Sequence, residues 1–164
     1  MTTKNQTILS KDIDNKKITV VREFTAPVED VWAAWTDASL LDQWWAPKPW
    51  KAITKSMDFR EGSYWLYYMS GPAGEQIWNR VDFITIDSQK SFIAESYFCD
   101  EAGKNNFTIA GMHWENRFYK TGEGTKVEVE ITFAEKADFE KIIEMGFEAG
   151  FTAALENLDK LLGK

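Results

Sequence analysis

The stretch that decides the fold is APVEDVWAAWTDASLLDQWWAP, residues 26–47, in which four tryptophans fall within 22 positions. Pro27 suits the first turn of an α-helix, because the N–H group that it lacks would have no partner there in any case. Val31 and Trp35 lie four residues apart and therefore share one face of this helix. Aromatic residues at this density are consistent with a packed scaffold, a recognition surface or the mouth of a pocket.

A second short helix is predicted over residues 37–45, DASLLDQWW. Asp37 is a good N-cap residue, since its carboxylate accepts hydrogen bonds from the free N–H groups of a helix start. Pro47 and Pro49 end the helix, because proline lacks the N–H that a helix interior needs. We therefore interpret the tryptophans as scaffold for two helices that close one end of the domain, with at most one or two of them reaching a pocket.

Strand-like segments lie on both sides of these helices. Residues 18–25, ITVVREFT, are rich in β-branched side chains. Six further strands are predicted at residues 51–59, 63–70, 76–86, 91–99, 111–120 and 125–133. The turns between them are short, which favours an antiparallel meander over parallel βαβ units. The sequence therefore predicts an α+β fold with a curved, seven-stranded antiparallel sheet.

The chain ends in a segment of helical periodicity, predicted as one long helix over residues 136–162. Gly146 and Gly150 fall in its middle, where each costs up to ~1 kcal/mol relative to alanine. Close packing, a tolerated kink or space left for a ligand would each account for them. Residues 1–17 show no clear periodicity and are expected to form a flexible tail, so that residues 18–164 make up a single domain.

Composition indicates which classes of binding partner the protein can have. The net charge of −7 argues against nucleic acid, because an acidic surface repels phosphates. No segment approaches the ~20 apolar residues of a membrane span, and no signal peptide is evident. The single cysteine, Cys99, cannot form an internal disulfide, which fits a cytoplasmic protein. Eight tryptophans and eleven phenylalanines exceed ordinary packing needs and hint at an aromatic cavity.

Motifs for catalysis or metal binding are not evident. His113 is the only histidine, and no nucleophile motif accompanies it. Cys99 and His113 cannot supply the usual four ligands of a zinc site, and no glycine-rich phosphate loop occurs. The sequence predicts no catalytic residue, no metal and no cofactor, and we expect His113 to be a partly exposed strand residue.

Two carboxylates leave an alternative open. Glu95 interrupts an apolar strand, and alternation places Glu115 on the face of His113, opposite Trp114 and Asn116. An outward position is favoured, because burial of an unpaired charge costs several kcal/mol. If either carboxylate faced inward, the protein could instead be an enzyme of the cyclase or hydrolase kind.

The opening segment with its leading strand resembles the domain named for the activator of the heat-shock-protein-90 ATPase, within the START-like SRPBCC superfamily. That family's pattern reads R-x-F/I-x-A-P-x-x-x-V-W-x-A-W-T-x-x-x-x-L-x-x-W-W-x-P. This sequence supplies Arg22, Phe24, Ala26, Pro27, Val31, Trp32, Trp35, Thr36, Leu41, Trp44, Trp45 and Pro47. A second block resembles the family through Asp58, Arg60, Gly62, Trp65, Met69, Pro72 and Gly74. The closing helix does so through Gly146, Phe147, Phe151, Leu155 and Leu158.

The resemblance covers residues 18–162 and implies a helix-grip fold, in which the sheet wraps the C-terminal helix around a hydrophobic cavity. It implies that the cavity is lined by residues of four strands and of the helix. These are Trp65, Tyr67, Met69, Val81, Phe83, Phe92, Phe98, Trp114, Asn116, Phe118, Met145, Phe147 and Phe151. For each aromatic residue among them, plain core packing is the alternative.

The expected function is binding of a small hydrophobic or aromatic molecule, such as a lipid, polyketide or flavonoid, for which a stress response is one setting. An enzyme with a cavity carboxylate and an interaction protein that activates a chaperone ATPase are the alternatives. The superfamily includes carriers, cyclases and hydrolases, so the resemblance is specific for fold and much less so for function.

Overall fold

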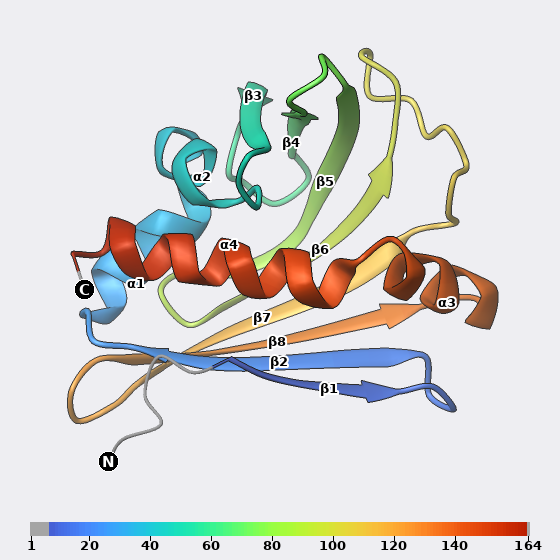
Figure 1. Cartoon of the computed structure of the whole chain (residues 1–164). Coiled ribbons are helices and arrows are strands. Elements are labelled where there is room, and N and C mark those ends of the chain that lie inside the picture. Colours follow the sequence, from blue (N-terminus) through green and yellow to red (C-terminus); the bar gives the residue numbers. More distant parts are fainter. Residues whose placement is uncertain (1–6, 164) are drawn as a thin grey trace.

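Alternation of apolar and polar residues along most strands folds the chain into one antiparallel sheet, in a computed structural model that describes residues 7–163 (Figure 1). The strands are β1 (Ile8–Asp12), β2 (Lys17–Phe24), β3 (Lys51–Met57), β4 (Tyr64–Ser70), β5 (Gln76–Asp87), β6 (Ser91–Phe98), β7 (Met112–Lys120) and β8 (Thr125–Phe133). Their order across the sheet is β1-β2-β8-β7-β6-β5-β4-β3. The predicted meander is confirmed for strands β3 to β8, each of which pairs with the next along the chain, and β2 joins the sheet beside β8.

The sheet has eight strands rather than the seven predicted. The additional one, β1, lies in the segment expected to be a tail, and it pairs with β2 through Ile8 opposite Val21. Only Leu9 of this edge strand is half-buried, so its sequence carries no hydrophobic pattern that would indicate a strand. The tail prediction is wrong for residues 8–12, and its first six residues lie outside the described part of the chain.

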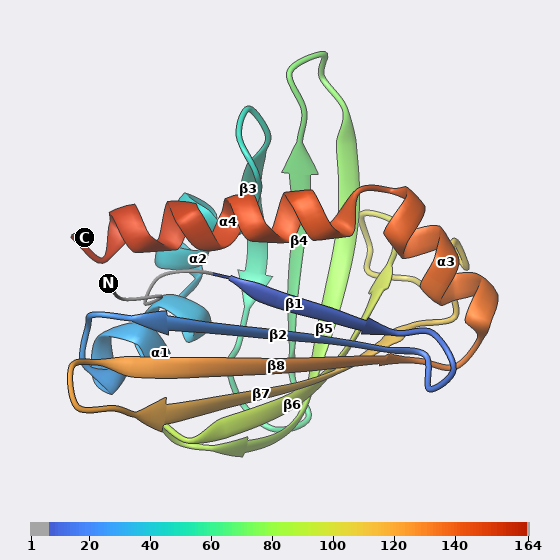
Figure 2. The ribbon, with the colours of Figure 1, turned by 60° about the horizontal axis from the view of Figure 1, so that its bottom comes forward.

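The sheet is strongly curved. In Figure 2 strands β1, β2 and β8 run along the direction of the C-terminal helix, whereas β3, β4 and β5 run across it. Along β2, β7 and β8 every second residue is buried on the concave side, Val20, Asn116 and Val129 among them. Cross-strand pairing places these three residues in one row. The concave face therefore holds the core and the convex face the polar residues.

Two short helices close one end of the sheet, as predicted: α1 (Val28–Thr36) and α2 (Ala38–Trp44). Asp37 caps α2, since its carboxylate accepts a hydrogen bond from the Ser39 N–H at 2.9 Å. Fully buried Trp44 donates from Nε1 to the Ala34 carbonyl at 2.9 Å. This bond ties the two helices together, so Trp44 belongs to the scaffold.

The C-terminal segment forms two helices rather than one. They are α3 (Lys136–Glu144) and α4 (Phe147–Leu161), and α4 crosses the concave face of the sheet in Figure 1. Gly146 separates them with a φ of 89°, a conformation that side chains other than glycine rarely adopt. The break between the helices therefore explains why residue 146 is a glycine, which helical periodicity alone did not explain. At the other end of α4, Asp159 forms a buried ion pair with Arg22 of β2.

Candidate functional site

Cross-strand registers bring the polar and aromatic residues of the concave face together. Tyr67 of β4 lies directly opposite Asn79 of β5. One row along, Val81 of β5 pairs with Ser96 of β6, and Ser96 pairs with Met112 of β7. Directly paired side chains on one face approach closely, so these rows form a continuous wall.

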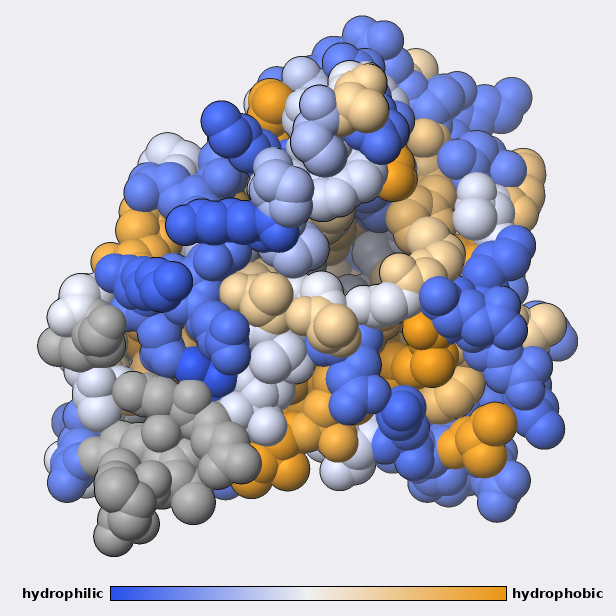
Figure 3. Space-filling model, viewed as in Figure 1, coloured by the Kyte–Doolittle hydropathy of each residue, from blue (hydrophilic) through white to orange (hydrophobic). Residues whose placement is uncertain are grey.

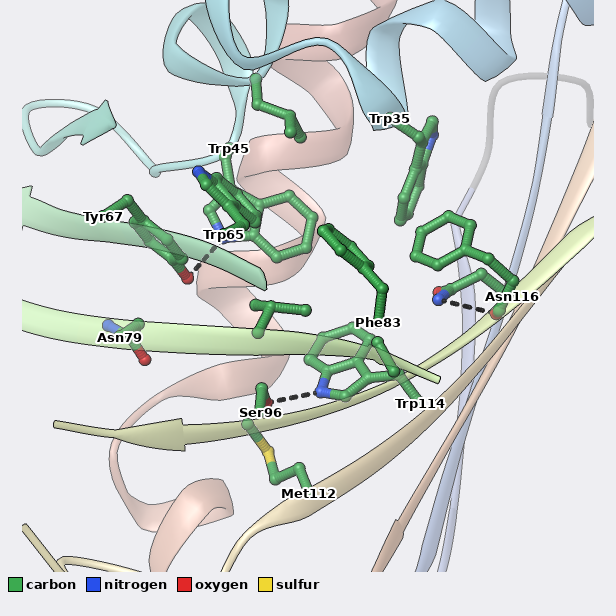
Figure 4. Close-up of a pocket in the computed structure, with 14 residues that line it drawn as sticks. Trp35, Trp45, Trp65, Tyr67, Asn79, Phe83, Ser96, Met112, Trp114 and Asn116 are labelled. Carbon is green, nitrogen blue, oxygen red and sulfur yellow. Dashed lines mark hydrogen bonds between the residues drawn. The ribbon is translucent and has the colours of Figure 1, made fainter. Parts of the chain in front are cut away.

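A small inner chamber of about 60 Å³ lies between this wall and the helices that close it (Figure 4). It is lined by residues from α1, α2, the segment after α2 and strands β4 to β7. They are Trp35, Leu41, Trp45, Trp65, Tyr67, Asn79, Val81, Phe83, Phe92, Ala94, Ser96, Met112, Trp114 and Asn116. This volume accommodates a few water molecules but is far below the ~150 Å³ of a cavity known to accept benzene.

A larger outer chamber of about 330 Å³ adjoins it beneath the first turn of α4. Its lining consists of Trp45, Pro47, Trp50, Tyr67, Met69, Ile77, Asn79, Phe98, Met112, Trp114, Ile142, Met145, Gly146, Phe147, Gly150 and Phe151. Five of these residues also line the inner chamber: Trp45, Tyr67, Asn79, Met112 and Trp114. Figure 3 shows the surface hollowed between α4 and the ends of β3 to β5, with apolar residues around the hollow.

Twelve of the thirteen predicted cavity residues line one or both chambers. Met145 does so from the rim, since it is 53% exposed. Gly146 and Gly150 line the outer chamber as well, so one of the open explanations for the glycines, space beside the helix, matches their position. Whether these residues bind a ligand stays a prediction.

Phe118 is the exception, because it lines neither chamber. Its ring packs against Trp32 at 5.0 Å between centroids and against Trp35 at 5.8 Å. Helix α1 inserts both indoles at this end of the concave face, so no space remains beside Phe118. The prediction of a cavity position is therefore wrong for Phe118, and core packing is its role.

Of the four tryptophans in residues 26–47, two reach the chambers, as expected. Trp35 lines the inner chamber, and Trp45 lines both. The indole Nε1 of Trp45 donates to the Tyr67 hydroxyl at 2.8 Å. Trp65 stacks on Tyr67 with 4.1 Å between ring centroids. The phenol at the junction of the chambers is thus held by two indoles.

The polar groups at this junction are uncharged. Burial raises the pKa of Tyr67 well above its ordinary value, although the hydrogen bond from Trp45 acts in the opposite direction. Tyr67 is therefore a neutral phenol whose O–H remains available as a donor. Trp114 donates from Nε1 to the Ser96 hydroxyl at 2.8 Å (Figure 4).

Two asparagines are less completely bonded. Asn116 is 2% exposed, and its Nδ2 donates to the Phe92 carbonyl across a long 3.4 Å. Its Oδ1 is buried without a hydrogen-bond partner among the described residues. The side chain of Asn79 donates from Nδ2 to the Ile77 carbonyl at 3.2 Å. An unpartnered buried oxygen costs free energy, so Asn116 marks a position where a donor would be favourable.

The sequence analysis missed several cavity residues. Asn79 lies two positions before Val81, so the same alternation that placed Val81 inside also indicates Asn79. Ser96 lies on the inward set of its strand for the same reason. Trp50 could not be found from spacing, because it lies in irregular backbone, and Ile142 shares the apolar stripe of α3, whose periodicity indicates burial but not a cavity position.

The carboxylates lie on the opposite, convex face. Glu95 and Glu115 flank His113, with the His113 Nε2 at 3.4 Å from Glu115 and Nδ1 bonded to Glu95. The favoured outward position is confirmed for both, and the alternative of a catalytic Glu95 or Glu115 inside the cavity is wrong. Partial burial opposes protonation of His113, but hydrogen bonds and charges from the two glutamates outweigh it and raise the pKa of the imidazole.

Neither the thiol of Cys99 nor a cluster of metal-binding side chains offers a reactive centre among the described residues. Cys99 is buried, and burial together with the charge of Asp100 raises the pKa of its thiol to about 11. The thiol is therefore protonated at neutral pH, which is unfavourable for a nucleophile. Within residues 7–163 no three His, Cys, Asp or Glu side chains come together as a metal site. In the same range no helix has the length and apolar character needed to cross a bilayer.

Comparison with known proteins identifies the family. The model of the "Activator of Hsp90 ATPase homolog 1-like protein" family matches residues 25–163. The chain belongs to this family. No protein of curated function matches it. The resemblance read from the three sequence blocks is thereby confirmed, and so is the α+β helix-grip fold apart from the number of strands.

Solved structures of similar proteins superpose on almost the whole of this chain. A protein from Arthrobacter aurescens is 30% identical, with a TM-score of 0.89 and coverage of 94% of this chain and 90% of that one. A protein from Mycobacterium smegmatis is 27% identical, with a TM-score of 0.88 and coverage of 94% and 95%. A Nitrosomonas europaea protein is 25% identical, with a TM-score of 0.78 and coverage of 90% and 94%.

Proposed function

We propose that this family member binds a small hydrophobic or aromatic molecule in the outer chamber, with its inner end at the junction formed by Tyr67 and Asn79. The observation that carries the proposal is the outer chamber itself, which has a volume of about 330 Å³ and opens beside α4. Ligand sites are concave, mostly apolar and furnished with a few polar groups, and typically measure ~300–1,000 Å³. The chamber matches this description in size and lining.

Its walls support the proposal in a second way. Trp45, Trp114, Phe147 and Phe151 present rings to the chamber, and the Phe147 and Phe151 rings stack at 5.2 Å between centroids. Aromatic walls favour a ligand with rings, because ring pairs add ~0.5–1.5 kcal/mol to the burial of apolar area. Lipids, polyketides and flavonoids remain the compound classes to test.

The test is a titration of the protein with a panel of these compounds, in which tryptophan fluorescence is measured after each addition. We expect saturable quenching, because Trp45, Trp50 and Trp114 line the chamber. Gly150→Leu should abolish it by filling the chamber, since Gly150 lines it and a Cβ there meets only Pro47, at 3.7 Å. Ala149→Leu introduces the same side chain at an exposed position of the same turn and should bind normally. Absence of binding across the panel, or equal binding by both variants, would sink the proposal.

The family description also names a chaperone ATPase, so a chaperone partner is the second candidate function. It is tested by adding the protein to a cognate chaperone and measuring ATP hydrolysis with and without it. Stimulation would favour this candidate, and an unchanged rate would count against it. The cytoplasmic location remains a prediction from the lone Cys99, which a fractionation experiment would check.

A further inference from the structure

The chambers differ from the rest of the molecule in charge. The chain contains 26 acidic residues and 19 lysines and arginines. Neither chamber has a single Asp, Glu, Lys, Arg or His among its described lining residues. A carboxylate or phosphate that entered would lose its water without gaining a counter-charge, at a cost of several kcal/mol per ion. The cavity is therefore built for an uncharged molecule.

Hydrogen-bonding capacity is nevertheless present, and it is concentrated toward the inner end. Asn79 and Tyr67 face each other across β4 and β5 at the junction, and Asn116 lies deeper. The unpartnered Oδ1 of Asn116 accepts hydrogen bonds only. Trp35 Nε1, which is also buried without a partner among the described residues, offers a donor in the same inner chamber.

The two chambers differ in volume and therefore in the part of a ligand that each can hold. About 330 Å³ in the outer chamber suffices for ring systems, whereas about 60 Å³ in the inner one suffices for a small substituent or a few water molecules. A ligand that occupies both would place its rings outside the junction and one small polar group inside it.

We infer that the site selects uncharged aromatic molecules that carry a hydroxyl or N–H donor at their inner end, and that Asn116 and Asn79 determine this selectivity. Asn116 Oδ1 accepts the donor in the inner chamber. Asn79 and the Tyr67 hydroxyl contact the same polar end at the junction. This inference rests on the proposed function and specifies the chemical class of its ligand.

Three probes with one ring system test it: naphthalene, 2-naphthol and 2-naphthoate. At neutral pH they are apolar, uncharged with a donor, and anionic, respectively. Isothermal titration calorimetry should give 2-naphthol an affinity about tenfold above naphthalene, the magnitude of one net hydrogen bond. It should give 2-naphthoate the weakest affinity. Indole N–H shifts of Trp45 and Trp114 in NMR spectra locate each probe at the chambers.

Variants separate the asparagines from the rest of the wall. Asn116→Leu removes the unpartnered oxygen and should bring 2-naphthol to the affinity of naphthalene, whose own binding stays within about twofold. Asn79→Leu should act in the same direction, and it serves as the second test if Asn116→Leu fails to fold. Phe118→Leu is the matched control, because Phe118 lines neither chamber, and it should keep the preference for 2-naphthol.

The possible results separate selectivity by the two asparagines from hydrophobic binding as such. Equal binding of the three probes, or an unchanged 2-naphthol preference in both asparagine variants, overturns the inference and leaves hydrophobic binding intact. Failure of all three probes to bind the native protein overturns the inference, and absence of binding across the lipid, polyketide and flavonoid panel overturns the proposed function as well.

Discussion

The two ends of the concave face are equally aromatic but differ in what fills them. At the end closed by α1, Trp32 lies edge-on to Phe59, Phe92 and Phe118 with centroids 5.0–5.8 Å apart. We call these four residues the filled end, because their rings pack against one another, although Phe92 also borders the small inner chamber and Trp32 and Phe59 border an open hollow on the outer surface. Beneath the start of α4 the rings of Trp114, Phe147 and Phe151 border an outer chamber of about 330 Å³, which we call the hollow end. Aromatic content alone does not distinguish a core from a cavity.

The helix that covers each end makes the difference. Helix α1 places Val31, Trp32 and Trp35 over the sheet, and all three are buried. The first turn of α4 instead presents Gly146 and Gly150 to the chamber. A Cβ built on Gly146 would meet nothing within 4 Å. Missing side chains on the covering helix, rather than special residues on the sheet, leave the space.

The largest expected effect is at the filled end. Trp32→Ala should lower the free energy of unfolding by about 3–5 kcal/mol, because the cavity that it leaves lies among rings that cannot all relax. Chemical denaturation monitored by circular dichroism measures the loss. A loss below about 1 kcal/mol would show that this end is not packed as described.

A matched change at the hollow end should cost less. Phe147 is half-buried and already borders open space, so Phe147→Ala should lower the free energy of unfolding by only about 1–2 kcal/mol. The same denaturation experiment compares the two variants directly. Losses of equal size would remove the distinction between the two ends.

The two glycines should respond in opposite directions to alanine. Gly150→Ala should raise the free energy of unfolding by up to ~1 kcal/mol, because alanine favours the helix and its Cβ would lie an ordinary 3.7 Å from Pro47 Cγ. Gly146→Ala should lower it by about 1 kcal/mol, since φ is 89° there. Thermal unfolding of both variants is the measurement. The same sign for both would contradict the assigned backbone roles.

The smallest effect belongs to neither end but to the convex face. Because folding raises the pKa of His113, protonated His113 stabilises the native state fully below the ordinary histidine value of about 6.5. That contribution is lost as the pH rises through the raised value. Water screens the partly exposed pairs, so we expect less than about 1 kcal/mol. His113→Gln should remove this part of the pH dependence of denaturation, and an identical profile would exclude the assignment.

Much of the fold follows from local patterns. Alternation in β8 and the spacing of Val31 and Trp35 in α1 each predict one buried face. The structure buries the predicted residues in both elements. β1 escaped detection because an exposed edge strand needs no apolar face, only the backbone partners that β2 supplies. The break before α4 escaped because Gly146 is compatible both with a weak helix and with the left-handed turn that it adopts.

The cavity could be predicted from the sequence only in part. Strand alternation indicates which residues face inward, Asn79 and Val81 among them, but it contains no information on whether space lies beyond them. Phe118 illustrates the limit, because it alternates inward as Trp114 does, and yet α1 fills the volume beside it.

By itself the sequence determined the family, the order of most elements and the inward faces of the strands, since these depend on the identity and spacing of neighbouring residues. Only the tertiary structure decided where the molecule is filled and where it is hollow. Volume depends on how the helices approach the sheet from distant parts of the chain. That approach also left the oxygen of Asn116 unpartnered within. The four tryptophans of residues 26–47 accordingly divide between scaffold and chamber wall, although they belong to one continuous segment.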